Sequence, residues 1–137
     1  MEEEFLFVYG TLMKDYPQNP FKSAFQTSTE YVGKAYTFGK LYLVDYYPGI
    51  VANKLGENFK TFGEIYKIKK PESLLLTLDE YEDYFPNDQD KSLYIRRKTN
   101  CILLETENSI HCWAYFYNQA VDKLKYFKNG DFFDKVN

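Results

Sequence analysis

The stretch that most constrains the fold is the main helical pattern of the chain, at residues 71–83. Pro71 suits the first turn of a helix, Glu72 suits the positive end of the helix dipole, and no interior residue breaks the pattern. At about 100° per residue, four apolar positions share one arc of this helix: Leu74, Leu75, Leu78 and Tyr81. We therefore predict an amphipathic helix that packs on the rest of the domain.

Glu82 is the residue of this stretch that needs an explanation. It follows Leu75 by seven positions and Leu78 by four, so it belongs to the apolar arc, whereas Glu80 should face water. A carboxylate at a core-facing position is unfavourable unless it is paired, protonated or used. The alternative to a functional role is a structural carboxylate bonded to a tyrosine or an arginine, with Arg96 as a candidate partner.

Strand patterns dominate the rest of the chain. The hydrophobic share is 45% and the aromatic share 20%, which favours a sheet-rich fold over a helical bundle. Strands are predicted at 5–9, 31–45, 50–52, 62–68, 93–104 and 110–117. Gly33 and Gly39 are expected as bulge or kink points, and a short helix at 21–26. We predict a single α+β domain over residues 1–137, with about six strands and one main helix.

Charge and termini exclude several classes of partner. The net charge is −3 with no basic block, so nucleic acid is not an expected partner. The acidic N-terminus argues against a signal peptide, and no apolar run is long enough to span a membrane. Cys101 and Cys112 could form one disulfide bridge, but without a secretion signal we expect a cytoplasmic protein in which both are reduced thiols.

A glycine loop follows the first strand. Residues 5–9 are almost wholly apolar, as in a buried strand, and Gly10-Thr11-Leu12 follow them directly. Glycine permits a sharp turn that leaves backbone N–H groups outside the sheet, where they can bind an anion. The alternative is a plain structural turn.

The sequence supports a nucleophilic cysteine or a metal site less well than it supports an acid–base role of Glu82. His111 and Cys112 are neighbours on a predicted strand and point to opposite faces, and Cys101 could meet His111 only if the strands pair favourably. One histidine and two scattered thiols make no metal-ligand set, so no metal is expected. Neither a Walker phosphate loop nor a dinucleotide glycine pattern is present, and no cofactor is expected.

Five short motifs occur in a characteristic order: Val8-Tyr9-Gly10-Thr11-Leu12, Pro48-Gly49-Ile50-Val51, Gly63-Glu64-Ile65-Tyr66, Leu78-Asp79-Glu80-Tyr81-Glu82 and Tyr94-Ile95-Arg96-Arg97. Together they resemble the γ-glutamylcyclotransferase-like family, in particular its branch of γ-glutamylamine cyclotransferases and AIG2-like proteins. The resemblance extends from Phe5 to about Phe132. It implies a small mixed β-barrel flanked by helices, with the active site at one mouth.

The resemblance also implies roles for individual residues. Glu82 matches the catalytic glutamate of the family. The implied substrate-binding residues are Tyr9, Gly10, Thr11 and Leu12, with Tyr117 as a further aromatic lining the cavity. The chain departs from the family at Asp83, where glycine often follows the catalytic glutamate, and this extra carboxylate can alter both substrate choice and the end of the helix.

The implied reaction is a cofactor-independent cyclisation. The α-amine of a γ-glutamyl amine or γ-glutamyl amino acid closes on the γ-carbonyl, which gives 5-oxoproline and the free amine. The expected partner is thus a small γ-glutamyl molecule, and the activity is of transferase or lyase type. The alternatives are a module of the same fold that binds a small acidic ligand without turnover, and a thiol-dependent hydrolase.

Overall fold

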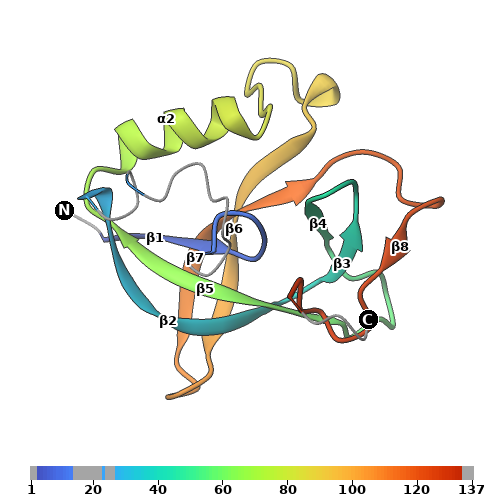
Figure 1. Cartoon of the computed structure of the whole chain (residues 1–137), viewed down its shortest axis with the longest axis horizontal. Coiled ribbons are helices and arrows are strands. Elements are labelled where there is room, and N and C mark those ends of the chain that lie inside the picture. Colours follow the sequence, from blue (N-terminus) through green and yellow to red (C-terminus); the bar gives the residue numbers. More distant parts are fainter. Residues whose placement is uncertain (1–2, 14–22, 24–26, 134–137) are drawn as a thin grey trace.

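The computed structural model describes residues 3–13, 23 and 27–133 (Figure 1). The short helix expected at 21–26 lies outside these ranges, apart from Ser23. The described part of the chain contains one α-helix of more than one turn, a 3₁₀ turn at Gln89–Lys91 and eight strands. In chain order the main elements are β1 (Glu4–Val8), β2 (Thr29–Phe38), β3 (Lys40–Leu43), β4 (Pro48–Val51), β5 (Lys60–Ile68), α2 (Pro71–Tyr81), β6 (Tyr94–Leu103), β7 (Ser109–Tyr117) and β8 (Lys125–Tyr126).

Five of the strands close into a barrel. They are hydrogen-bonded in the order β1-β5-β2-β6-β7, and β7 returns to pair with β1 through Leu6 and Trp113. This closing pair is parallel, as is the β4–β7 pair, and the other strand pairs are antiparallel. The strands β4, β3 and β8 extend the sheet beyond β7, away from α2 (Figure 1). The structure therefore confirms the predicted mixed β-barrel.

Two apolar cores form because successive side chains of a strand point to opposite faces. In β1, Phe7 contributes to one core, whereas Leu6 and Val8 contribute to the other. The first core fills the barrel and includes Phe7, Ala35, Ile65, Cys101, Cys112 and Ala114. The second lies between the barrel wall and α2 and includes Leu6, Val8, Tyr66, Leu74, Leu75 and Leu78. The amphipathic helix thus covers one side of the barrel, as predicted.

Two glycines interrupt the regular pairing of the long strand that was expected at 31–45, and one of them divides it. Gly39 separates β2 from β3, and a register shift between Tyr31 and Gly33 marks a bulge in β2. A Cβ atom at Gly39 would lie 2.8 Å from the Ile50 side chain, so only glycine fits at this corner. The predicted kink points are confirmed, but the single strand is two. Pro48 and Gly49, which precede the strand expected at 50–52, already belong to β4.

Candidate active site

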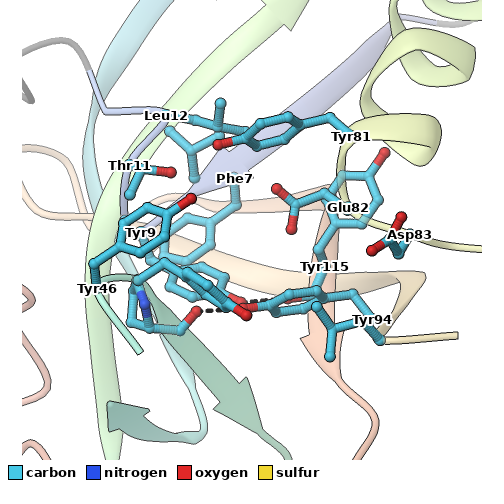
Figure 2. A pocket seen from close by; sticks show the side chains of 15 residues that line it. Phe7, Tyr9, Thr11, Leu12, Tyr46, Tyr81, Glu82, Asp83, Tyr94 and Tyr115 are labelled. Carbon is cyan, nitrogen blue, oxygen red and sulfur yellow. Dashed lines mark hydrogen bonds between the residues drawn. The ribbon is translucent and has the colours of Figure 1, made fainter. Parts of the chain in front are cut away.

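A cavity of about 210 Å³ lies where the end of β1, the β3–β4 connection and the C-terminal end of α2 meet (Figure 2). This volume is below the roughly 300–1,000 Å³ typical of pockets for drug-sized ligands, so it suits a small metabolite. Its lining residues are Phe7, Val8, Tyr9, Gly10, Thr11, Leu12, Tyr46, Tyr47, Pro48, Tyr81, Glu82, Asp83, Leu93, Tyr94 and Tyr115.

The glycine loop forms one wall of this cavity. Gly10 packs so closely on Pro48 that a Cβ atom would lie 2.7 Å from the proline ring, which requires glycine. The backbone N–H of Met13 donates to the Gly10 carbonyl at 3.0 Å and closes a tight turn. Within the described part of the chain, no hydrogen-bond partner is found for the backbone N–H groups of Gly10 and Thr11. These two buried amides can therefore bind an acceptor that enters the cavity.

Tyr9 is fixed by hydrogen bonds across the barrel. Its hydroxyl donates to the carbonyl of Tyr115 and accepts from the backbone N–H of Ile50 at 3.2 Å. Burial, together with the charge of Glu82, raises the pKa of Tyr9 far above its ordinary value. Tyr9 is thus a neutral wall residue rather than an acid or a base. The hydroxyl of Tyr94 is held similarly, because it donates to the Pro48 carbonyl at 2.6 Å.

The end of α2 positions Glu82. The helix ends at Tyr81, two residues before the end of the predicted stretch, and Glu82 is its C-cap. The N–H of Tyr84 donates to the Asp79 carbonyl at 2.9 Å, and the N–H of Asp83 donates to the Glu80 carbonyl at 3.3 Å. These two bonds are those of a Schellman motif, whose C′ residue adopts a left-handed conformation. Asp83 occupies this position with φ of 54°, a conformation that favours glycine.

The side chain of Glu82 points into the cavity (Figure 2), and its carboxyl group makes no hydrogen bond or ion pair with any described residue, whereas its backbone N–H donates to the Leu78 carbonyl at 2.8 Å. Glu82 is half-buried and lines the cavity. Burial raises the pKa of Glu82 from 4.5 to about 8, and the negative charge of Asp83 adds to this rise. A carboxyl group with a pKa near neutrality can both accept and donate a proton.

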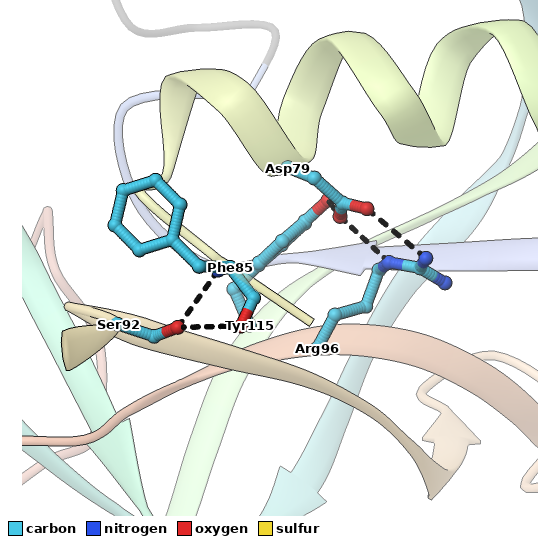
Figure 3. Close-up of polar contacts among 5 residues, drawn as sticks. All are labelled: Asp79, Phe85, Ser92, Arg96 and Tyr115. Atoms are coloured by element: carbon cyan, nitrogen blue, oxygen red, sulfur yellow. Dashed lines mark hydrogen bonds and ion pairs between the residues drawn. The ribbon is translucent and has the colours of Figure 1, made fainter. Parts of the chain in front are cut away.

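The structural carboxylate of this helix is Asp79, which the sequence analysis overlooked (Figure 3). Asp79 is 6% exposed and accepts two hydrogen bonds from Arg96, from Nε at 2.7 Å and from the terminal nitrogen at 3.1 Å. The hydroxyl of Tyr115 donates to the same carboxylate at 2.6 Å. Arg96, considered as a partner for Glu82, therefore pairs with Asp79 instead. The position of Asp79, four residues after Leu75, could have indicated its inward orientation.

The loop after α2 is held to the barrel and keeps the helix end in place. The buried Ser92 hydroxyl accepts a hydrogen bond from the N–H of Phe85 at 2.7 Å (Figure 3). The N–H of Leu93 donates to the carbonyl of Asp83 at 3.0 Å. Glu82 and Asp83 thus lie between a packed helix and a tethered loop, so their backbone is held on both sides.

Five of the six predicted site residues meet at this cavity: Tyr9, Gly10, Thr11, Leu12 and Glu82. Tyr117 does not line the cavity, which corrects the expectation; it packs on Tyr94, with ring centroids 5.6 Å apart. The aromatic residue that β7 contributes is Tyr115, two positions earlier and on the same strand face. Tyr81, expected in the core, is 39% exposed and lies at the cavity instead.

The two thiols lie away from this site, inside the barrel. Cys101 and Cys112 are fully buried, and register places His111 opposite Asn100, on the other face of the sheet from Cys101. A hydrogen bond with Cys101 and burial raise the pKa of Cys112 far above its ordinary value, so this thiol stays protonated. No thiol–histidine pair forms. The described residues contain no group of three His, Cys, Asp or Glu side chains able to hold a metal ion.

Fold and site together define a small β-barrel protein with a carboxyl group in a cavity at the barrel mouth. The sequence profile of the AIG2-like gamma-glutamyl cyclotransferases matches residues 6–134, and the chain belongs to this family. None of the described helices has the length and apolar character needed to cross a membrane.

Individual relatives are similar over most of their length. A Drosophila melanogaster protein named "Putative gamma-glutamylcyclotransferase" is 30% identical over 123 residues, which are 87% of this chain and 73% of the relative. A Methanocaldococcus jannaschii protein of the same name is 27% identical over 133 residues, covering 96% of this chain and 97% of the relative. The crystal structure of an AIG2-like protein from Mus musculus superimposes with a TM-score of 0.74 at 23% identity, covering 99% of this chain and 93% of that one. This last likeness concerns the fold.

Proposed function

We propose that the protein is a cyclotransferase that converts a γ-glutamyl amine or γ-glutamyl amino acid into 5-oxoproline and the free amine. The observation that carries this proposal is Glu82, a carboxyl group without a partner among the described residues, directed into a small cavity and with a pKa raised to about 8. The glycine loop contributes the second requirement, because the amides of Gly10 and Thr11 are available to anionic oxygen.

The chemistry needs one group that moves protons. The Glu82 carboxylate accepts a proton from the substrate α-ammonium, and the resulting amine attacks the γ-carbonyl carbon. The new C–N bond closes a five-membered ring, and the carbonyl oxygen becomes an oxyanion. Collapse of this intermediate breaks the original amide bond, and Glu82 donates its proton to the departing nitrogen. The attack leaves two protons on the ring nitrogen, and the Glu82 carboxylate then carries one of them to the released amine, which departs as an ammonium ion. The attacking nitrogen has thus lost two protons and the leaving nitrogen has gained two, so Glu82 ends in its starting, ionised state.

The attack is intramolecular, so proximity already lowers the barrier and no covalent enzyme intermediate is needed. The site then has to orient the substrate and stabilise charge. We assign the substrate carboxylate or the oxyanion to the amides of Gly10 and Thr11, which can donate hydrogen bonds without reorganising. The α-ammonium belongs beside Glu82, where its positive charge favours the ionised form of the carboxyl group.

The test is an assay for 5-oxoproline with a panel of γ-glutamyl amines and γ-glutamyl amino acids, in the presence of a chelator. The wild-type protein should release 5-oxoproline, and acylation of the substrate α-amine should abolish the reaction. Glu82→Gln keeps the shape of the side chain but removes its titratable proton, so turnover should fall roughly 10²- to 10⁴-fold while ligand binding persists.

The matched control is Glu80→Gln, because Glu80 is exposed on the same helix and does not line the cavity. This variant should retain wild-type turnover. Normal turnover by Glu82→Gln would make the carboxylate structural and overturn the assignment. If folded wild-type protein binds members of the panel but releases no 5-oxoproline from any of them, the chain is a binding module of the same fold.

A further inference from the structure

A proline ring supports the glycine loop from behind. Pro48 is the first residue of β4 and is buried. Gly10 packs on its ring so closely that a Cβ atom at Gly10 would lie 2.7 Å from Cγ and 2.8 Å from Cδ of Pro48. The ring is a rigid group, because it is closed onto the backbone nitrogen. The position of the Gly10 turn in the cavity therefore depends on where the Pro48 ring lies.

Tyrosine hydroxyl groups hold the start of β4. Pro48 has no backbone N–H, so its carbonyl is the one main-chain group through which it can be hydrogen-bonded. The hydroxyl of Tyr94 donates to this carbonyl at 2.6 Å (Figure 2). Two residues further on, the N–H of Ile50 donates to the hydroxyl of Tyr9 at 3.2 Å. The backbone that carries the Pro48 ring is thus fixed on both sides of Gly49.

Tyr94 is itself held firmly. It is 3% exposed, and its ring packs on those of Tyr117 and Tyr47, with centroids 5.6 Å and 6.4 Å apart. Burial raises the pKa of Tyr94 far above its ordinary value, so the hydroxyl keeps its proton and remains a donor. The bond from Tyr94 to Pro48 therefore connects a packed aromatic side chain of β6 to the support of the glycine loop.

We propose that Tyr94 and Pro48 are positioning residues: the Tyr94 hydroxyl fixes Pro48, and the Pro48 ring fixes the turn that directs the amides of Gly10 and Thr11 into the cavity. The effect on rate rests on the proposed cyclotransferase function, whereas the effect on the loop does not. Tyr94 also lines the cavity, so its action through Pro48 has to be separated from a direct contact of its hydroxyl with the substrate.

The first variant is Tyr94→Phe, which removes the hydroxyl and keeps the ring. Because donors that are slightly misplaced stabilise developing charge poorly, kcat/KM for 5-oxoproline release should fall roughly tenfold. The matched control is Thr61→Val, since Thr61 is also fully buried and donates to a backbone carbonyl, that of Gly39 at 3.1 Å, but does not line the cavity. Thr61→Val should lower Tm to a similar extent and keep the wild-type kcat/KM. Unchanged kcat/KM in Tyr94→Phe, or an equal loss in Thr61→Val, overturns the proposal.

A double-mutant cycle shows whether Tyr94 acts through Pro48. Pro48→Ala keeps the carbonyl that accepts from Tyr94 but removes the ring carbons on which Gly10 packs. It should lower kcat/KM roughly tenfold by itself. Addition of Tyr94→Phe should then cost less than about threefold more, because the support is already lost. A full further loss would place the Tyr94 hydroxyl on the substrate and overturn the route through Pro48.

The glycine loop provides a readout that does not depend on turnover. Backbone order parameters from ¹⁵N relaxation are measured for the full chain without ligand. Tyr94→Phe and Pro48→Ala should each lower the values of Gly10 and Thr11 by about 0.1 or more, whereas Thr61→Val should leave them unchanged. If wild-type protein releases no 5-oxoproline from any γ-glutamyl amide, the proposed function fails. Unchanged order parameters of Gly10 and Thr11 in Tyr94→Phe overturn the positioning role, whether or not the protein is active.

Discussion

At the residue scale, three carboxylates near the end of α2 have different surroundings. Asp79 is buried and fully paired, because Arg96 and Tyr115 donate to it. Asp83 is exposed, and its backbone lies in the left-handed conformation. Glu82 lies between them, desolvated but without a hydrogen bond from any described residue, and this is the environment that raises the pKa of a carboxyl group.

The activity should therefore depend on pH through Glu82. The pKa of about 8 predicts that kcat/KM rises as pH increases toward that value, because the carboxylate is the form that accepts the proton. Asp83→Asn removes the nearby negative charge, so this limb should move to lower pH. The measurement is a pH profile of kcat/KM for both proteins. An unmoved limb in Asp83→Asn would show that Asp83 does not act on Glu82 electrostatically.

The stability of the folded protein should also depend on pH through Glu82, but it should fall as pH rises, whereas kcat/KM should rise. The pKa of Glu82 is higher in the folded protein than its ordinary value of 4.5, so the folded state binds more protons between pH 4.5 and about 8. This contribution is fully present below 4.5 and is lost as pH rises through about 8. Thermal unfolding of the unliganded protein should thus show a fall in Tm across this window that Glu82→Gln lacks. Parallel pH dependence in the two proteins would contradict the shifted pKa.

The periodicity of the sequence indicated that Glu82 faces inward, but it could not show whether Glu82 pairs with another side chain. The spacing from Leu75 and Leu78 predicts an inward-facing carboxylate, which the structure confirms. Whether Arg96 pairs with Glu82 or with Asp79 depends on where β6 lies against the helix. That placement is a tertiary property, because residues 17 positions apart meet only after the strand has joined the barrel.

At the element scale, the end of α2 carries a strained residue. Asp83 has φ of 54° at the C′ position of the Schellman motif, where a side chain meets the preceding carbonyl and glycine does not. Asp83→Gly should therefore stabilise the protein by about 1 kcal/mol, as measured by urea unfolding. Asp83→Asn is the control, because it removes the charge and keeps a Cβ, and it should change stability less. An equal gain in both variants would assign the effect to charge repulsion with Glu82 rather than to the backbone.

The contacts of Asp79 with Arg96 and Tyr115 connect α2 to the barrel. Asp79→Asn removes the charge that Arg96 and Tyr115 share, and it leaves a partly buried guanidinium without its counter-ion. We expect a loss of roughly 3 kcal/mol in the free energy of unfolding. Tyr115→Phe removes only one hydrogen bond of the network and should cost about 1 kcal/mol. Urea titrations of both variants make the comparison, and a smaller loss in Asp79→Asn than in Tyr115→Phe would contradict the proposed anchoring role of this network.

At the scale of the whole molecule, sequence patterns predicted which residues form strands better than they predicted how the strands pair in the sheet. The alternation in 110–117 correctly separates Cys112, Ala114 and Phe116, which face the barrel interior, from Trp113 and Tyr115 on the other face. Closure of the barrel depends on the parallel contact of Leu6 with Trp113, more than 100 residues apart in the chain. No local pattern specifies such a pair, so the barrel was expected from the family resemblance and not from periodicity.

This arrangement leads to a final prediction about the thiols. Cys101 and Cys112 fill the barrel interior, fully shielded from solvent, with no histidine on their side of the sheet. Cyclisation needs no covalent intermediate, so a Cys101→Ala/Cys112→Ala protein should keep its kcat when assayed below its Tm. Its stability should fall by about 1–2 kcal/mol per site, because each change leaves a small void in a packed core. Unfolding measured beside the assay separates the two effects. Loss of kcat in protein that remains folded would instead place a thiol in the reaction, and the assignment to Glu82 would have to be abandoned.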